Sequence, residues 1–469
     1  QELPPFINPK EMLVQEDCLI ANVYVPITED KNLPVLVYIH GGAFLMGFGN
    51  MVTPKNFVIE KKIIIVTFNY RLGAHGFLCL GTKDIPGNAG LKDQVALLRW
   101  VKKNIASYGG DPKKVSIAGF SAGSMSADLL MLAKSAKGLF NNVILESGTN
   151  VGSLAVQRNP LENAKEFARK LNFTNVDDIY ALEEFYKSAS LDKLYLNIFF
   201  DRKDASILFG PCVERKTSSA FISDAPVNII KSGDYKKVPI LLGNTNMEGL
   251  LYFSWFNVWM DEMNEKFATF LPADLHFENE AQKDEVATVI KEFYFSDEPV
   301  AEETVLPYID YLSDTSFGFP LLRAVRLHAE SGHKQVYLYE YSFVEDSQSV
   351  VPFTKVRGAA HCAQSSAIFD GKGTANKNES LLSEELRKMK ATMRDLWYNF
   401  VVYGKPVPEG SSLPSWPPAG ANRSPHMSLG RTIELKGPYL ESRARFWEDI
   451  YEKYYRDPIP PPAPPHTEL

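Results

Sequence analysis

The 469-residue chain has no long hydrophobic run and no cluster of basic residues. Its longest apolar runs, such as residues 63–68, fall far short of the ~18 residues that a membrane-spanning helix needs. We therefore expect no membrane span. The net charge of −7 at pH 7 also argues against a nucleic-acid partner. Such partners are bound by Lys and Arg side chains that neutralise phosphates.

Cysteine and histidine are scarce, with four and eight residues respectively. No C-x-x-C or H-E-x-x-H pattern occurs, so a zinc site has no support, and we expect neither a metal nor a cofactor. Apolar neighbours are the usual surroundings of a free cysteine. We therefore interpret Cys79, Cys212 and Cys362 as buried thiols.

Short apolar runs alternate with longer helical patterns over most of the chain. Strands are predicted at residues 36–39, 63–68, 115–118, 143–145, 238–242 and 336–341, and helices at 91–107, 122–132, 384–402 and 443–455. This alternation predicts an α/β fold, with a central, mostly parallel sheet covered by helices on both faces. Long insertions are expected at about 149–235 and 251–332. We expect a single domain at 1–456 and a proline-rich tail at 457–469.

The pentapeptide Gly-Phe-Ser-Ala-Gly at residues 119–123 fits the pattern G-x-S-x-G. The pattern alone is weak in a chain with 30 glycines. Its context is stronger, because it follows a predicted strand and opens a predicted helix, as a nucleophile elbow requires. Ser121 is therefore the candidate nucleophile. The alternative is an ordinary strand-turn-helix with an idle serine, which this context disfavours.

A second glycine-rich turn, His-Gly-Gly-Ala-Phe at residues 40–44, follows the first predicted strand. Hydrolases with a nucleophile elbow place further backbone donors of the oxyanion hole after such a strand. The N–H groups of Gly42, Ala43 and Ala122 are our candidates. A turn without a ligand role remains the alternative. A phosphate-binding loop is disfavoured, because Gly47 is followed by Phe48 rather than by Gly-Lys.

A reactive serine needs a base and an acid, which the chain order Ser…acid…His places later in the sequence. His361 follows the predicted strand 336–341, whereas the other histidines lie before the elbow, in polar surroundings or in the tail. Glu248 follows the strand 238–242 on a turn bounded by Gly243 and Gly249. Pattern alone leaves a solvent-facing histidine and a solvated surface glutamate as open alternatives.

Motifs along nearly the whole chain carry a resemblance to a known family. They are Glu-Asp-Cys-Leu at 16–19, His-Gly-Gly-Ala-Phe at 40–44, Asn-Tyr-Arg-Leu-Gly at 69–73, Gly-Gly-Asp-Pro at 109–112, Gly-Phe-Ser-Ala-Gly at 119–123, Glu-Ser-Gly at 146–148 and Gly-Lys-Pro at 404–406. In this order they resemble the type-B carboxylesterase/cholinesterase family, and within it insect carboxylesterases, including the antennal, pheromone-degrading type. The resemblance implies the α/β-hydrolase fold with long helical insertions. It also implies a serine carboxylesterase that needs no cofactor.

The resemblance assigns roles to individual positions. It implies catalytic roles for Ser121, Glu248 and His361, and oxyanion-hole roles for Gly42, Ala43 and Ala122. Supporting positions around this site fall on Gly41 and Ser147, and a buried structural ion pair falls on Arg71 and Asp93. The implied substrate is a small hydrophobic ester, such as a xenobiotic, an acetate pheromone or a lipid-like ester. Noncatalytic adhesion proteins of the same fold lose members of the triad, so the intact set disfavours that alternative.

Three departures from the family pattern affect these expectations. Ala43 stands where many relatives have glycine, and its methyl group should narrow the acyl site. Phe120 stands where juvenile hormone esterases typically have Gln, which keeps juvenile hormone only as an alternative substrate. Cys362-Ala-Gln follows His361 where acidic residues are common, so we expect less polar surroundings for the base.

The family's N-terminal segment is usually longer than the 15 residues that precede Glu16. We therefore expect part of the family domain to be missing from this sequence, with Cys18 left unpaired. The aromatic segment at 251–259 has two open interpretations, core packing or a wall for a bulky acyl or alcohol group.

The last four residues, His-Thr-Glu-Leu at 466–469, resemble the H-D-E-L retention signal. We expect the preceding prolines to hold this signal away from the body, as an extended stalk does. Sequons at Asn172 and Asn378 are compatible with glycosylation. These features predict the lumen of the endoplasmic reticulum, with secretion as the alternative. They leave the oligomeric state open.

Overall fold

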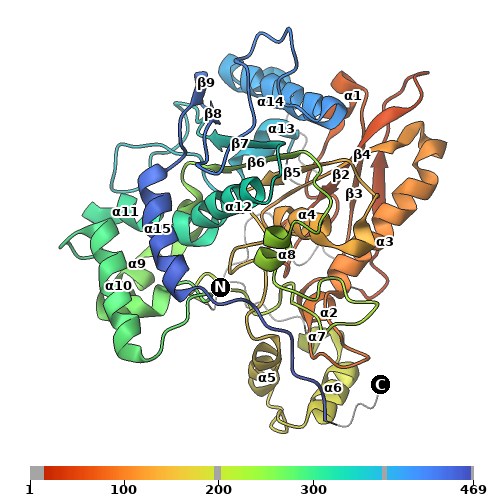
Figure 1. Cartoon of the computed structure of the whole chain (residues 1–469). Coiled ribbons are helices and arrows are strands. Elements are labelled where there is room, and N and C mark those ends of the chain that lie inside the picture. Colours follow the sequence, from red (N-terminus) through yellow and green to blue (C-terminus); the bar gives the residue numbers. More distant parts are fainter. Residues whose placement is uncertain (1–14, 195–201, 372–377, 466–469) are drawn as a thin grey trace.

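The computed structural model describes residues 15–194, 202–371 and 378–465. Within these residues nine strands form one sheet, in the order β1-β3-β2-β4-β5-β6-β7-β8-β9 (Figure 1). The strands are β1 (Ala21–Tyr24), β2 (Leu33–Ile39), β3 (Ile64–Phe68), β4 (Gly110–Phe120), β5 (Asn142–Glu146), β6 (Ile240–Thr245), β7 (Val336–Tyr341), β8 (His426–Leu429) and β9 (Ile433–Lys436).

The sheet is mostly parallel, as predicted. All neighbours from β3 through β2, β4, β5, β6 and β7 to β8 pair in parallel. Only the two outer strands, β1 and β9, pair antiparallel. Parallel strands bring their carboxyl ends to one edge of a sheet, and the loops at that edge carry ligand sites in open α/β folds.

Helices cover both faces of the sheet, because the central strands are buried on both sides. On β2, Val35, Val37 and Ile39 belong to one hydrophobic cluster, and Leu36 and Tyr38 belong to the other. The first cluster includes residues of α3 (Ala89–Asn104) and α4 (Ala122–Leu132). The second includes residues of α1 (Lys55–Lys61), α13 (Ala363–Ile368) and α14 (Glu384–Tyr403). The remaining short helix before the elbow is α2 (Gly73–Phe77).

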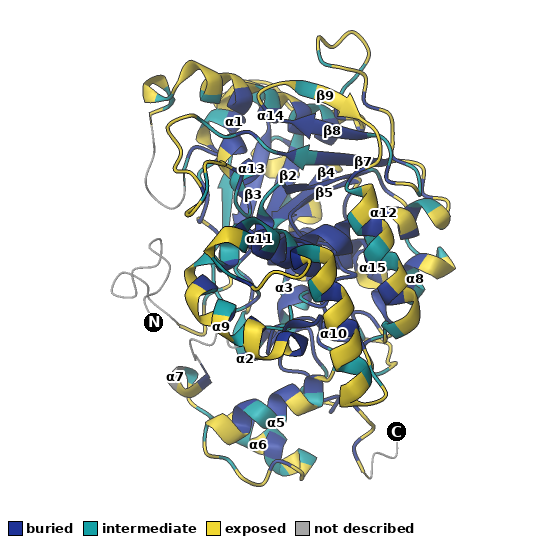
Figure 2. Cartoon of the chain, turned by 90° about the vertical axis from the view of Figure 1, so that its left-hand side faces the viewer, coloured by how far each residue is buried: buried dark blue, intermediate teal, exposed yellow. Residues whose placement is uncertain are grey.

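The predicted insertions are helical. The first holds α5 (Pro160–Lys170), α6 (Ile179–Ser188), α7 (Leu191–Leu194) and α8 (Pro226–Ser232). The second holds α9 (Phe256–Lys266), α10 (Glu280–Phe295), α11 (Val305–Ser313) and α12 (Phe319–Glu330), and α15 (Glu441–Tyr454) packs against α12. These helices are amphipathic, with buried faces turned inward and exposed faces outward (Figure 2). In the described part of the chain, no helix is long and apolar enough to cross a membrane.

Cys79 and Cys212 form a disulfide, so their interpretation as buried thiols is wrong. The bond joins the loop after α2 to the loop between α7 and α8, across 133 residues of sequence. Apolar neighbours suit a buried thiol and a buried disulfide equally, and only the tertiary structure brings these two side chains together. Cys362 is buried and forms no disulfide, as expected, and Cys18 is also outside any disulfide and is partly exposed.

The proline-rich segment packs on the body instead of extending from it, which corrects the stalk prediction for residues 457–465. Pro458, Pro461 and Pro464 are buried, whereas the four residues between them are exposed. This spacing of three matches the three residues per turn of a polyproline II helix. The Tyr180 hydroxyl of α6 donates to the Pro465 carbonyl at 2.8 Å. The tetrapeptide at 466–469 lies outside the described residues.

Candidate active site

Ser121 lies at the junction of β4 and α4 in a strained backbone conformation, with φ 53° and ψ −124°. Such a conformation is costly for a side-chain-bearing residue, and it is the geometry of a nucleophile elbow. Gly123 is required here, because a Cβ at this position would lie 2.1 Å from the Ile39 carbonyl oxygen of the neighbouring strand. The Ser121 N–H donates to the Glu146 carbonyl at 2.8 Å, which ties the turn to β5.

The glycine-rich turn after β2 lies beside the elbow. Gly42 has φ +114°, and a Cβ there would lie 2.1 Å from the Met46 carbonyl oxygen, so only glycine fits. Ala43 also has a positive φ of 51°. The backbone N–H groups of Gly42 and Ala43 donate to no described residue. Gly41 packs against Phe120, where a Cβ would lie 2.6 Å from the carbonyl oxygen.

Glu248 and His361 come together although 113 residues separate them. Glu248 begins the 3-10 helix η3 (Glu248–Trp255) after β6, and its Oε2 lies 2.5 Å from Nδ1 of His361. Backbone contacts align the two segments, because the Met247 N–H donates to the Ala359 carbonyl and Met247 and Ala360 form a parallel bridge. Glu248 is buried, so its carboxylate depends on these partners rather than on water.

The second oxygen of Glu248 accepts two further hydrogen bonds. The Thr245 N–H donates to Oε1 at 2.7 Å, and the Ser147 hydroxyl donates to the same oxygen at 2.6 Å. Ser147 therefore lies directly behind the Glu248 carboxylate. Gln364 Nε2 in turn donates to the Ser147 hydroxyl oxygen at 2.8 Å. No pattern in the sequence indicates this partner.

A second buried carboxyl group, that of Glu146, lies at the end of β5, just before Ser147. Its Oε2 accepts from the Ser365 hydroxyl at 2.8 Å and from the Tyr38 hydroxyl at 3.2 Å. Burial raises the pKa of Glu146 to about 8. The expectation of less polar surroundings for His361 stays a prediction, because the Glu146 side chain bonds to Ser365 and Tyr38.

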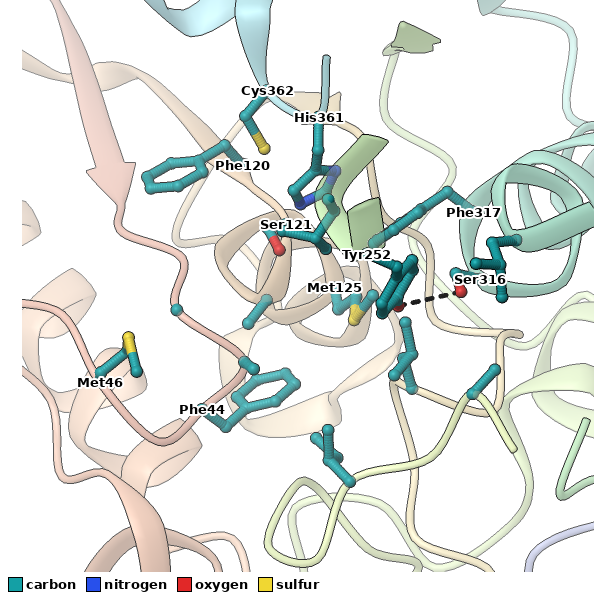
Figure 3. Close-up of a pocket in the computed structure, with 18 of the residues that line it drawn as sticks. Phe44, Met46, Phe120, Ser121, Met125, Tyr252, Ser316, Phe317, His361 and Cys362 are labelled. Carbon is teal, nitrogen blue, oxygen red and sulfur yellow. Dashed lines mark hydrogen bonds between the residues drawn. The ribbon is translucent and has the colours of Figure 1, made fainter. Parts of the chain in front are cut away.

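Ser121 and the His361 ring lie next to each other (Figure 3). Nε2 of His361 is buried and has no hydrogen-bond partner among the described residues. The Phe317 ring stacks on the imidazole, with centroids 4.3 Å apart. The imidazole thus has one nitrogen bound to a carboxylate and the other free near the serine, which is the arrangement of a general base.

These groups open into a cavity of about 730 Å³. Ser121, His361, Gly42, Ala43 and Ala122 all line it. The rest of the lining is mainly apolar and includes Phe44, Phe120, Met125, Tyr252 and Phe317 (Figure 3). Leu251, Trp255, Trp259, Leu312 and Phe369 also line the cavity.

The aromatic segment at 251–259 fits both of its open interpretations. Tyr252, Trp255 and Trp259 line the cavity. Phe256 is buried, and Phe253 stacks on it, although neither residue lines the cavity. The segment therefore contributes a cavity wall with one set of side chains and core packing with another.

Arg71 and Asp93 form the expected ion pair, through a bidentate contact of 2.7 and 2.8 Å. The Asp93 side chain is only 9% exposed, so it is buried as expected. The Arg71 side chain is 44% exposed, so the expectation of burial is wrong for this residue. The pair joins the loop after β3 to α3 near the glycine-rich turn, since the Gly73 N–H donates to the Phe44 carbonyl. Asn172 and Asn378 of the sequons are both exposed. The described residues contain no group of three or more potential metal ligands.

Comparisons with known proteins agree with this geometry. The model of the carboxylesterase family matches residues 3–447. Esterase FE4 of Myzus persicae is 32% identical over 89% of this chain and 75% of its own length, and a juvenile hormone esterase of Heliothis virescens is 31% identical over 86% and 74%. The crystal structure of juvenile hormone esterase from Manduca sexta, with OTFP covalently attached, superposes with a TM-score of 0.82 at 28% identity, covering 95% of this chain and 86% of that one. With an α/β-hydrolase sheet, a strained serine at its elbow and these relatives along nearly its whole length, this chain belongs to the carboxylesterase family.

Proposed function

We propose that this carboxylesterase hydrolyses hydrophobic esters through an acyl-enzyme on Ser121. The observation that carries the proposal is the His361 ring, which is bound to Glu248 through Nδ1 and free at Nε2, beside Ser121 in an apolar cavity. An imidazole in this state can accept the serine proton, whereas one bonded at both nitrogens could not.

In the first step His361 Nε2 takes the Ser121 proton, and the serine oxygen forms a bond to the ester carbonyl carbon. The carbonyl oxygen becomes an oxyanion, which the N–H groups of Gly42, Ala43 and Ala122 stabilise. Each such donor is worth on the order of 10²–10³ in rate. Glu248 keeps the imidazole oriented and stabilises its positive charge. The tetrahedral intermediate then collapses, and the imidazolium gives its proton to the leaving alcohol.

In the second step a water molecule takes the place of the alcohol. His361 removes one proton from it, and the resulting hydroxide attacks the acyl carbonyl in the same oxyanion hole. The bond to Ser121 breaks, the serine regains its proton from the imidazolium, and a carboxylic acid leaves. No cofactor enters either step.

The cavity supports a substrate that is hydrophobic on both sides of the ester. The cavity has a volume of about 730 Å³ and a mainly aromatic and aliphatic lining. Both properties suit a xenobiotic, an acetate pheromone or a lipid-like ester. Juvenile hormone is the alternative substrate, which the similarity to juvenile hormone esterases favours. A panel of esters with acyl chains of increasing length, together with juvenile hormone, would separate these classes by kcat/KM.

The proposed cellular location of the protein rests on features outside the active site. A disulfide persists in oxidising compartments and is rare in the cytosol, so Cys79–Cys212 supports the endoplasmic reticulum lumen or secretion. Exposed sequons at Asn172 and Asn378 fit the same compartments as glycosylation sites. Deletion of Leu469 tests retention. Release of the protein into the medium supports retention by the C-terminal tetrapeptide, and unchanged secretion contradicts it.

The activity is tested with a simple nitrophenyl ester. Wild-type protein should hydrolyse it, and Ser121→Ala should lose hydrolysis while keeping its circular dichroism spectrum. An organophosphate should label the wild type at Ser121 only. A noncatalytic binding protein, the second candidate, would neither hydrolyse the ester nor be labelled, because only an activated serine reacts.

A further inference from the structure

Helix α13 contacts the end of β5 through two consecutive pairs of residues. Gln364 bonds to Ser147, and Ser365 bonds to Glu146. His361 lies just before the same helix, so α13 positions the base and both of these polar contacts. Only the Gln364 contact continues to the acid, because the Ser147 hydroxyl is bonded to Glu248 Oε1.

The direction of this hydrogen-bond chain follows from donor and acceptor chemistry. The Ser147 hydroxyl has one proton, and a carboxylate only accepts, so the proton points to Glu248. The hydroxyl oxygen must then accept from Gln364, whose Nε2 donates at 2.8 Å. Gln364 and Ser147 are both fully buried, so no water competes for these bonds.

We propose that Gln364 is a positioning residue, which rests on the proposed function. Its amide N–H holds the Ser147 hydroxyl as a donor to Glu248, and this bond holds the carboxylate on His361. Gln364 does not line the cavity, so it acts through Ser147 and Glu248 and not on the substrate. Its amide stays neutral at every working pH. A carboxylate at this position would accept the Ser147 proton instead and reverse the chain.

Two substitutions separate this role from packing. Gln364→Met keeps the volume and removes the donor, and we expect kcat to fall about threefold to tenfold with KM little changed, as for a lost hydrogen bond near a charge. Gln364→Glu adds a negative charge and draws the Ser147 proton away from Glu248. Both effects stabilise the imidazolium form of His361, so the acid limb of the kcat/KM profile should move up by about one pH unit.

A double-mutant cycle tests the route through Ser147. Ser147→Ala should lower kcat about tenfold, and adding Gln364→Met should lower it no further, because the hydroxyl that Gln364 orients is already gone. Ser365→Ala is the matched control on the same helix. It loses the contact to Glu146, so its effect should add to that of Ser147→Ala.

The outcomes are distinguishable. Additive effects of Gln364→Met and Ser147→Ala, or an unmoved acid limb in Gln364→Glu, overturn the positioning role. If one variant does not fold, the other still decides the question, since each has its own readout. A wild-type protein that neither hydrolyses esters nor reacts with an organophosphate overturns the proposed function itself.

Discussion

The ring of Phe317 stacks on the imidazole of His361 at a centroid distance of 4.3 Å and an interplanar angle of 30°. Phe317 belongs to a short π-helix (Asp314–Gly318) between α11 and α12. Such segments are rare and are often found at functional sites. The stack limits rotation of the imidazole, so Nδ1 stays on Glu248.

Phe317→Leu should lower kcat about fivefold, because an aromatic pair contributes about 0.5–1.5 kcal/mol beyond the area that it buries. Steady-state kinetics with a short-chain nitrophenyl ester measures this loss. The control is Phe253→Leu, which breaks the stack on Phe256 outside the cavity and should leave kcat unchanged. Equal losses in both variants would contradict a role of the stack in orienting the base.

Ala43→Gly should broaden the acyl preference. The substitution removes a methyl group from the cavity wall and keeps the backbone N–H, and glycine adopts the positive φ of 51° without strain. We expect kcat/KM to rise about threefold to tenfold for branched acyl groups and to stay constant for acetate, since one methylene is worth about 1–3 kcal/mol in a pocket. Paired assays with nitrophenyl pivalate and nitrophenyl acetate measure this ratio. A parallel fall for both esters would mean that the oxyanion hole itself was disturbed.

Asp128, on α4, links stability to pH. Burial raises its pKa to about 7, although its Oδ2 accepts from the Asn150 N–H at 2.7 Å. Between the unfolded value of about 4 and the folded value, the native state holds a proton that the unfolded state has released. This contribution to the free energy of unfolding is therefore full below about pH 4 and is lost as the pH rises towards 7.

Asp128→Asn removes this titration. Urea unfolding at pH 5 and at pH 8 measures the free energy of unfolding of the variant and of the wild type. From pH 5 to pH 8 the difference between them should shift by on the order of 3 kcal/mol in favour of the variant. Ser126→Ala, on the same helix, removes no titratable group, so the control curve should stay parallel to that of the wild type. Parallel curves for Asp128→Asn and wild type would contradict a buried, protonated Asp128.

The disulfide should stabilise the fold without taking part in catalysis. Replacing Cys79 and Cys212 together by alanine should lower the free energy of unfolding by about 2–5 kcal/mol, because the bond closes a long loop. Thermal unfolding measures the loss, and kcat at 25 °C should remain. Cys18→Ala, which removes a free thiol, should change neither quantity.

The sequence predicted the parts of the molecule that depend on local pattern. The helix at 122–132 and the strand at 336–341 have the predicted limits, because each apolar run ends at a clear boundary. β4 begins at Gly110, five residues earlier than predicted, since its first residues are polar but still form part of the strand. The short strands β1, β8 and β9 are four residues each and leave no strong pattern.

The contacts around Ser121, Glu248 and His361 were harder to predict than these three residues themselves. Ser121 lies in a motif whose neighbours are required by its own turn. Glu248 and His361 needed the family resemblance, because a single carboxylate or imidazole after a strand is common. The contacts made by Gln364 and Phe317, and the Cys79–Cys212 bond, join segments that the sequence keeps far apart, so no local pattern marks them.

The spacing of the buried prolines limits how the length of the segment 457–465 can change. With three residues per turn, each added or removed residue rotates everything beyond it by about 120°. A single insertion after Pro458 would turn Pro461 and Pro464 out into water and present their exposed neighbours to the body. Only changes by multiples of three would keep the same prolines facing inward.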